Sequence, residues 1–231
     1  RLKIRCWKTV GHGSLSLTSA IQRSCNPYFM QLSTELGNER MANAFDMLNL
    51  GRATGVKLPA EDRGIIPGSE WWRRELHPGE SMTPARMAML AIGQDESEAT
   101  PLQLAALTAC IANGGKYYRP RIIKMVVDPK EGILISDIPE LRVDLVTEGM
   151  DSAQFADLRQ GMWKAANELG GTARRASPED VEIGAKTGTA QTTDFGEKSH
   201  NAWTVAFGPF EEPRYAVAVM VQNGKSGGKV C

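Results

Sequence analysis

The stretch Gly184–Gln191, which reads GAKTGTAQ, decides the fold and the chemistry expected of this chain. The β-branched residues around Lys186 favour a strand, and Gly188 lets a ligand backbone lie close to it. Lys186 offers a positive charge to an anionic ligand, with the hydroxyls of Thr187 and Thr189 beside it. The stretch therefore predicts an edge strand that binds an anionic substrate.

A second short motif, Ser24-Cys25-Asn26, lies about 160 residues upstream, between two predicted helices. A hydroxyl and an amide at such a junction can relay a proton and orient a substrate amide. A plainer interpretation is that Asn26, which precedes Pro27, is a helix N-cap and that Ser24 ends the previous helix. The order and separation of the two motifs favour the catalytic interpretation.

Residues 14–115 are predicted to be mainly helical, because apolar residues recur there at helical spacing between caps, prolines and glycines. The expected boundaries are Asn26–Gly37, Asn38–Gly51, a start at Thr83-Pro84 and a start at Thr100-Pro101. Residues 116–231 change character and contain most of the strand candidates. These two parts form the helical lobe and the sheet-containing lobe of one predicted domain, residues 1–231.

The sheet-containing lobe is predicted to hold one long helix followed by three strands in succession. The helix is Ser152–Leu169, a further strand-like segment is Arg121–Val127, and the three strands are Ile183–Gln191, Asn201–Gly208 and Arg214–Gln222, with a turn at Asp194-Phe195-Gly196. Strands joined by short connections usually pair as an antiparallel meander. The predicted fold class is therefore α/β, of the α+β type, with an antiparallel sheet flanked by helices beside an all-helical lobe.

Composition excludes several classes of function. The 231 residues carry 27 basic and 27 acidic side chains, so no basic face for nucleic acid is expected. There is no initiator Met and no apolar run long enough to span a bilayer, and we expect any export signal or anchor to lie outside this sequence. The four cysteines, Cys6, Cys25, Cys110 and Cys231, lack C-x-x-C or Cys/His ligand spacing. No metal, cofactor or disulfide is predicted.

Six stretches, in order and over about 220 residues, resemble the elongation-type class B penicillin-binding proteins, which share a fold with the serine β-lactamases. The matching stretches are residues 6–13, residues 20–29, residues 51–67, residues 92–94, residues 100–115 and residues 186–203. The resemblance implies a D,D-transpeptidase that cross-links peptidoglycan stem peptides through a serine acyl-enzyme and that β-lactams acylate. It also implies an extracytoplasmic location, a membrane anchor and a membrane glycan polymerase as partner.

The resemblance makes Ser24-Cys25-Asn26 the second and Lys186-Thr187-Gly188 the third of the family's three catalytic boxes, and it assigns a role to each matching site residue. The catalytic residues would be Ser24, Asn26 and Lys186, and the substrate-binding residues Thr187, Gly188, Thr189 and Gln191. Ser24 would shuttle a proton. The hydroxyl of Thr189 would hold the substrate carboxylate, and its backbone N–H would be one of two oxyanion donors.

Three departures from the family pattern limit what can be carried over. No S-x-x-K box, which supplies the nucleophilic serine, stands ahead of Ser24, so the chain alone is expected to be inactive. Asp95 stands where the family has glycine, and the sequence stops at Cys231, before a helix that normally covers the sheet, so an exposed apolar patch is expected.

Other functions remain open at this point. A degenerate transpeptidase fold that only binds peptidoglycan or a partner is one alternative, and a serine β-lactamase is another. Gly224-Lys225-Ser226 resembles the end of a phosphate loop, but Val219 stands where that motif needs its first glycine. His12 and His200 have no recognisable partner and are expected to be surface or loop residues.

Overall fold

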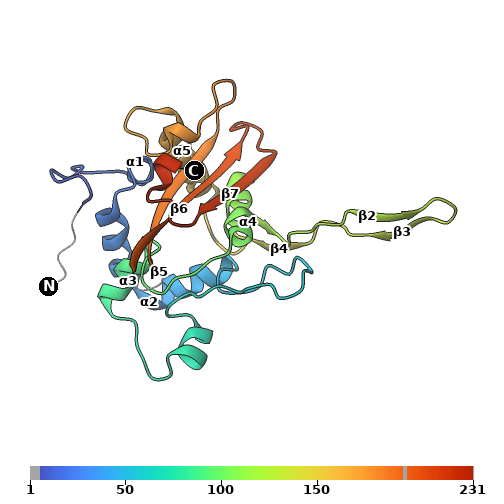
Figure 1. The fold of residues 1–231 in the computed structure, drawn as a ribbon, viewed down its shortest axis with the longest axis horizontal. Coiled ribbons are helices and arrows are strands. Elements are labelled where there is room, and N and C mark those ends of the chain that lie inside the picture. The colour runs from blue at the N-terminus through green and yellow to red at the C-terminus, as the bar shows by residue number, and fades with distance from the viewer. Residues whose placement is uncertain (1–5, 195–196, 231) are drawn as a thin grey trace.

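A computed structural model describes residues 6–194 and 197–230 and confirms the predicted three-stranded antiparallel meander. Strand β5 (Gly184–Asp194) pairs with β6 (Glu197–Gly208), which pairs with β7 (Tyr215–Val221), so β5 is an edge strand (Figure 1). In the register, Lys186 lies opposite Val205 and Thr189 opposite Ala202. The strands β5 and β6 are longer than predicted, and the expected turn residues Phe195 and Gly196 lie outside the described residues.

Helices cover the sheet and form its core. The helix α4 (Pro101–Ala112) packs on β7, α5 (Ser152–Asn167) packs on β5, and α1 (Leu17–Gln22) packs on α5. One cluster joins all three helices to β6 through Ile21, Ala112, Met162 and Phe207. The arrangement places the start of β5 and the end of α1 around the same core.

The helix starts predicted at Thr83 and Thr100 are observed. Thr100 caps α4 in a reciprocal capping box with Gln103, and Thr83 caps α3 (Pro84–Leu90). The helix α2 (Asn26–Met47) is broken at Gly37, whose φ of 78° is left-handed. The break agrees with the predicted boundary between a helix ending at Gly37 and one beginning at Asn38. The prediction that Asn26 caps α2 is wrong, because Cys25 occupies the N-cap position and makes no side-chain cap bond.

Shorter elements complete the chain. They are the π-helical turn η1 (Trp72–Leu76), the strands β1 (Lys116–Tyr118), β2 (Met125–Asp128), β3 (Gly132–Ser136) and β4 (Leu141–Asp144), the 3-10 turn η2 (Arg174–Ala176) and α6 (Gly227–Val230). The predicted strand Arg121–Val127 is observed only from Met125, and Leu169 lies beyond the end of α5 and is 84% exposed. No described helix is long and apolar enough to cross a membrane.

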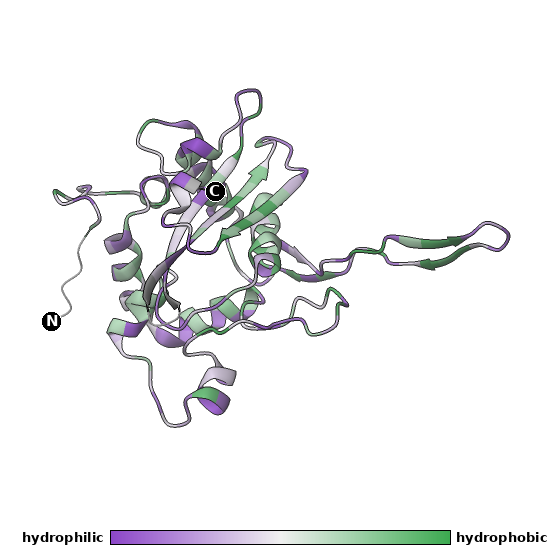
Figure 2. Cartoon of the chain, viewed as in Figure 1, coloured by the Kyte–Doolittle hydropathy of each residue, from purple (hydrophilic) through white to green (hydrophobic). Residues whose placement is uncertain are grey.

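Two apolar surfaces are left uncovered by the described residues. The β2–β3 hairpin projects away from the body of the molecule, and both of its strands carry exposed apolar side chains (Figures 1 and 2). The outer side chains of β7 are also exposed, among them Val217 and Val219. The exposed face of β7 agrees with the apolar patch expected from the sequence.

Candidate active site

Ser24 lies in a tight turn between α1 and α2, and close helix packing fixes its position. Its φ is 48°, an uncommon left-handed value for a residue with a side chain. The helix α1 crosses α5 at Gly161, where an added Cβ would lie 2.8 Å from the side chain of Ile21. A larger residue at position 161 would therefore push α1, and Ser24 with it, away from the sheet.

Lys186 reaches Ser24 from the edge strand. Its Nζ donates a hydrogen bond to Ser24 Oγ at 2.5 Å and another to the carbonyl of Thr187 at 2.6 Å. The two residues are 162 positions apart in the sequence, so the contact exists only in the folded chain. The structure thus brings the two predicted motifs together.

The ammonium of Lys186 is desolvated, although the residue as a whole is only partly buried. Burial lowers its pKa from 10.5 to about 8, because removal of water disfavours the charged form. A lysine with such a pKa is still mostly protonated at pH 7 and gives up its proton more readily than an exposed lysine. The group can therefore supply a positive charge or take part in proton transfer.

Thr172, which sequence reasoning missed, adds a second hydroxyl to the site. Thr172 Oγ1 lies 3.1 Å from Ser24 Oγ, and the Thr172 N–H donates to the carbonyl of Gln22 at 3.3 Å. Thr187 Oγ1 donates to the Thr172 carbonyl at 3.5 Å, a long hydrogen bond. The loop after α5 therefore connects the Ser24 turn to β5, and no local pattern in the sequence indicates this contact.

The third-box residues beyond Lys186 lie along the open edge of β5. Thr189 Oγ1 accepts a hydrogen bond from the Gly227 N–H at 3.3 Å, which leaves its own O–H free to donate to a ligand. Gly188 is exposed, and an added Cβ there would meet only Trp203 Cβ, at 3.5 Å. This part of the strand is accessible to a substrate.

The remaining predicted residues differ in their placement. The Gln191 N–H donates to Gln94 Oε1 at 3.2 Å, so Gln191 is on the same open edge. Asn26 begins α2, and its amide makes no hydrogen bond within the part of the chain that the structure describes. A cavity of about 970 Å³ runs beside the edge and is lined by residues 188–192 of β5 and by residues 92, 93 and 95–99 of the loop after α3.

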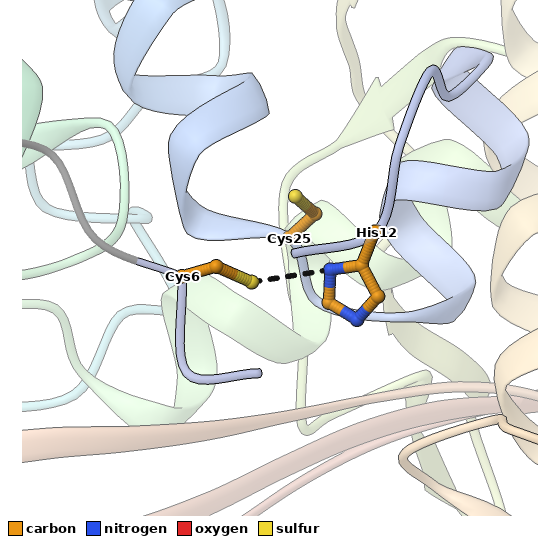
Figure 3. A group of neighbouring side chains, drawn as sticks. All are labelled: Cys6, His12 and Cys25. Carbon is orange, nitrogen blue, oxygen red and sulfur yellow. Dashed lines mark hydrogen bonds between the residues drawn. The ribbon is translucent and has the colours of Figure 1, made fainter. Parts of the chain in front are cut away.

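A cysteine and histidine cluster lies directly beside the second motif, contrary to the expectation from sequence spacing (Figure 3). Cys6 Sγ lies 3.2 Å from His12 Nδ1, and the ligand atoms of Cys6, His12 and Cys25 are all within 4.8 Å of one another. Burial raises the pKa of the Cys25 thiol and, with nearby Lys8 and Arg23, lowers the pKa of His12.

The cysteine and histidine side chains of this cluster are ligand types that Zn²⁺ prefers. Sequence spacing gave no sign of the cluster, because folding joins residues that are far apart in the chain, and the expectation of no metal site stays a prediction. Among the described residues, Cys6, Cys25 and Cys110 are free thiols, and Cys231 lies outside the described residues.

A lysine on an open sheet edge, hydrogen-bonded to a serine at a helix junction, is the arrangement that the sequence predicts for the penicillin-binding class of serine acyl transferases. Comparison with known proteins agrees with this class. The family model for the penicillin-binding protein transpeptidase domain matches residues 1–230, and the chain belongs to this family.

Relatives and solved structures place the chain near the elongation-type class B members. The chain is 33% identical to stage V sporulation protein D of Bacillus subtilis over 96% of its own length and 32% of that protein. It is 31% identical to peptidoglycan D,D-transpeptidase MrdA of Acinetobacter baumannii, over 98% of the chain and 34% of that protein. It therefore spans about a third of these curated relatives.

The fold is similar to solved penicillin-binding proteins. The complex between penicillin-binding protein PBP2 and MreC from Helicobacter pylori matches with a TM-score of 0.81 and 31% identity, over 99% of this chain and 40% of that chain. PBP2 of Pseudomonas aeruginosa in complex with WCK 5153 matches with a TM-score of 0.77 and 33% identity, over 98% of this chain and 48% of that chain. The predicted fold class is confirmed.

Proposed function

We propose that the protein is a peptidoglycan D,D-transpeptidase that cross-links stem peptides through a serine acyl-enzyme and is acylated by β-lactams at the same serine. The contact between Lys186 Nζ and Ser24 Oγ, at the head of an open strand edge, carries this proposal. The relatives named peptidoglycan D,D-transpeptidase support it. The residue roles and the division into a helical lobe, residues 14–115, and a sheet-containing lobe, residues 116–231, are part of the proposal.

The chemistry follows from the groups along β5. The serine of an S-x-x-K box attacks the acyl carbon, a C–O bond forms, and the C–N bond of the amide breaks. The proton lost by that serine passes through Ser24 to the departing amine, while Lys186 stabilises the negative charge that develops. The Thr189 N–H donates to the oxyanion, and the Thr189 hydroxyl donates to the substrate carboxylate. Attack by the amine of a second stem peptide then forms the new amide and frees the serine.

The nucleophile is not supplied by the residues that precede Ser24 in this sequence. The letters S-x-x-K also occur at Ser226–Lys229, but they follow the third box and so stand in the wrong chain order. Asn26 keeps its proposed role in orienting the substrate amide, since its side chain is unengaged among the described residues and therefore available to a ligand.

We also propose a location outside the cytoplasm, a membrane anchor, and a membrane glycan polymerase as partner. This part of the proposal rests on relatives whose names refer to cell-wall synthesis. The Helicobacter pylori protein was solved as a complex with MreC, so at least one similar protein assembles with a second protein.

Covalent labelling of the full-length gene product with a fluorescent penicillin tests the function. Slow release of the label is expected for a transpeptidase, because the acyl-enzyme is stable to water. Fast release would indicate a β-lactamase instead, and the absence of a label would indicate a non-catalytic binding module.

Intact-mass spectrometry of the isolated 231-residue chain after incubation with penicillin gives a second test. No adduct is expected, because the serine that should be acylated is not among these residues. An adduct that maps to Ser24 would show that Ser24 is the nucleophile, and an adduct on another serine would show that the site is assigned wrongly.

A further inference from the structure

We propose that Gln94 is a built-in competitor for the edge of β5. Its side-chain amide occupies main-chain groups that an incoming peptide strand would use, and substrate must displace it. The proposal rests on the function proposed above, because it concerns how a ligand reaches the same strand. Gln94 lies outside the three catalytic boxes, and under this proposal it determines which ligands bind to the edge of β5.

Gln94 pairs with β5 as a neighbouring strand would. Its Nε2 donates to the carbonyl of Thr189 at 3.0 Å, and its Oε1 accepts from the N–H of Gln191 at 3.2 Å. One side-chain amide thus satisfies an acceptor and a donor two residues apart on the same edge. Those are the groups through which an antiparallel partner is held.

The contact covers part of the edge and leaves another part open. Within a strand, the N–H and C=O of one residue point to the same side. Thr187, Thr189 and Gln191 therefore all direct their main-chain groups towards the open edge. Lys186 Nζ donates to the carbonyl of Thr187. The side chain of Gln94 bonds the next main-chain acceptor and donor, which are the Thr189 carbonyl and the Gln191 N–H. The Thr189 N–H, the proposed oxyanion donor, is not one of the groups that Gln94 uses.

The loop that carries Gln94 is anchored, so displacement needs only the side chain to move. The Gln94 N–H donates to the Met89 carbonyl at 3.0 Å, and the neighbouring Asp95 carboxylate accepts from Arg86 Nε at 2.9 Å. Gly93 and Asp95 both have a φ of 69°, which winds the loop tightly around Gln94. A cavity of about 970 Å³ is lined by Gly93 and Asp95, the two sequence neighbours of Gln94.

The competition should discriminate between ligands by one chemical feature. A ligand with an amide N–H that bonds the Thr189 carbonyl must first remove Gln94 Nε2 from it. A ligand that lacks this donor can react at the Thr189 N–H while Gln94 stays in place. Gln94 therefore lowers the reactivity of the first kind of ligand and spares the second.

The test compares two β-lactams on the full-length gene product, one with an amide N–H in its side chain and one without. The variant Gln94→Met keeps the length of the side chain and removes both hydrogen bonds. Gln154→Met, on the exposed face of α5, is the matched control. Gln94→Met is expected to speed acylation by the amide-bearing ligand roughly 5- to 10-fold, the effect of about one net hydrogen bond, and to leave the other ligand unchanged. The control should change neither rate.

Acylation by the amide-bearing ligand that is slower in Gln94→Met, or a change equal for both ligands, would overturn the proposal, because it would mean that Gln94 only supports the strand. Failure of both ligands to acylate the unmodified protein would instead count against the proposed function. Amide hydrogen exchange then still tests Gln94: Gln191 should exchange faster in Gln94→Met, while Ala190, whose N–H points towards β6, should not. Unchanged exchange at Gln191 would overturn the proposal.

Discussion

The two halves of β5 differ in how they are held, although they belong to one strand. The inner half, Gly184–Lys186, is packed into the core: Ala185 is fully buried, and Gly184 lies against the ring of Phe207. The outer half, residues 188–191, is largely exposed and is held by hydrogen bonds to the side chain of Gln94 and the backbone of Gly227.

The difference shows how one strand can serve two needs. A charge contributes most to catalysis when its surroundings are fixed before the reaction, which the packed inner half provides for Lys186. Recognition of a peptide requires unpaired main-chain groups, which only an accessible edge can offer. Substitutions in the packed half are therefore expected to lower the stability of the protein. Substitutions in the open half are expected to leave stability almost unchanged but to weaken ligand binding.

The largest effect is expected from Lys186→Ala in the full-length gene product. Acylation by penicillin should fall on the order of 100-fold or more, because a fixed charge in a site of low dielectric is removed. Stopped-flow labelling measures the rate, and circular dichroism checks that the variant is folded. Lys116→Ala, at an exposed position in β1, is the control and should react normally. A folded Lys186→Ala variant with a normal rate would rule out the assigned role.

The same substitution in the two halves of the strand should separate packing from recognition. At Gly184 an added Cβ would lie 2.5 Å from the Phe207 ring, so Gly184→Ala should lower the free energy of unfolding by about 1–3 kcal/mol. At Gly188 the nearest atom would be 3.5 Å away, so Gly188→Ala should change it by less than about 0.5 kcal/mol. Urea denaturation of both variants gives the comparison, and equal losses would contradict the division of the strand.

A smaller effect is expected from Thr189→Ala. Loss of the hydroxyl should slow acylation roughly 10-fold, about 1.4 kcal/mol, because one hydrogen bond to the ligand carboxylate is lost while the backbone donor remains. Labelling kinetics measure the rate, and Thr147→Ala, in an exposed turn, is the matched control. A loss as large as that of Lys186→Ala would mean that the hydroxyl takes part in the chemical step.

A further expected effect is a pH dependence of stability. The pKa of Lys186 is lowered to about 8 in the folded chain, so between about pH 8 and 10.5 the unfolded state binds more protons. The unfavourable free energy of burying the charged Lys186 ammonium is therefore fully present below pH 8. It decreases as the pH rises through this window. The free energy of unfolding of the wild type, measured by urea denaturation, should rise with pH relative to that of Lys186→Met, by at most about 1.4 kcal/mol per pH unit. If the free energies of unfolding of the two proteins changed with pH in parallel, the lowered pKa of Lys186 would be contradicted.

Local patterns predicted the fold well where the signal lies within one element. The helix start at Thr100-Pro101 and the break at Gly37 depend on neighbouring residues, and both were predicted correctly. The apolar period placed Leu169 in α5, but the helix ends at Asn167 and Leu169 is exposed. The helical spacing of apolar residues alone does not show at which residue a helix ends.

From the sequence, only the site residues that lie within the two motifs could be predicted. Lys186 and Ser24 were expected to meet because their order and separation are those of the family, and they do. Thr172, Gln94 and the Cys6 cluster were missed, because each joins segments that only the tertiary fold brings together. The roles assigned to the site residues all stay predictions; these residues are Ser24, Asn26, Lys186, Thr187, Gly188, Thr189 and Gln191.

The projecting β2–β3 hairpin has a consequence for proteolysis. A two-stranded ribbon without a packed face is only marginally stable, so its peptide bonds should open to a protease before those of the body. Its base is clamped by Arg119, which is bonded to Asp137 at 2.8 Å and to Glu140 at 2.7 Å. Trypsin should therefore cut first at Lys124 or Lys130, and the two fragments should stay together as a nicked, folded protein.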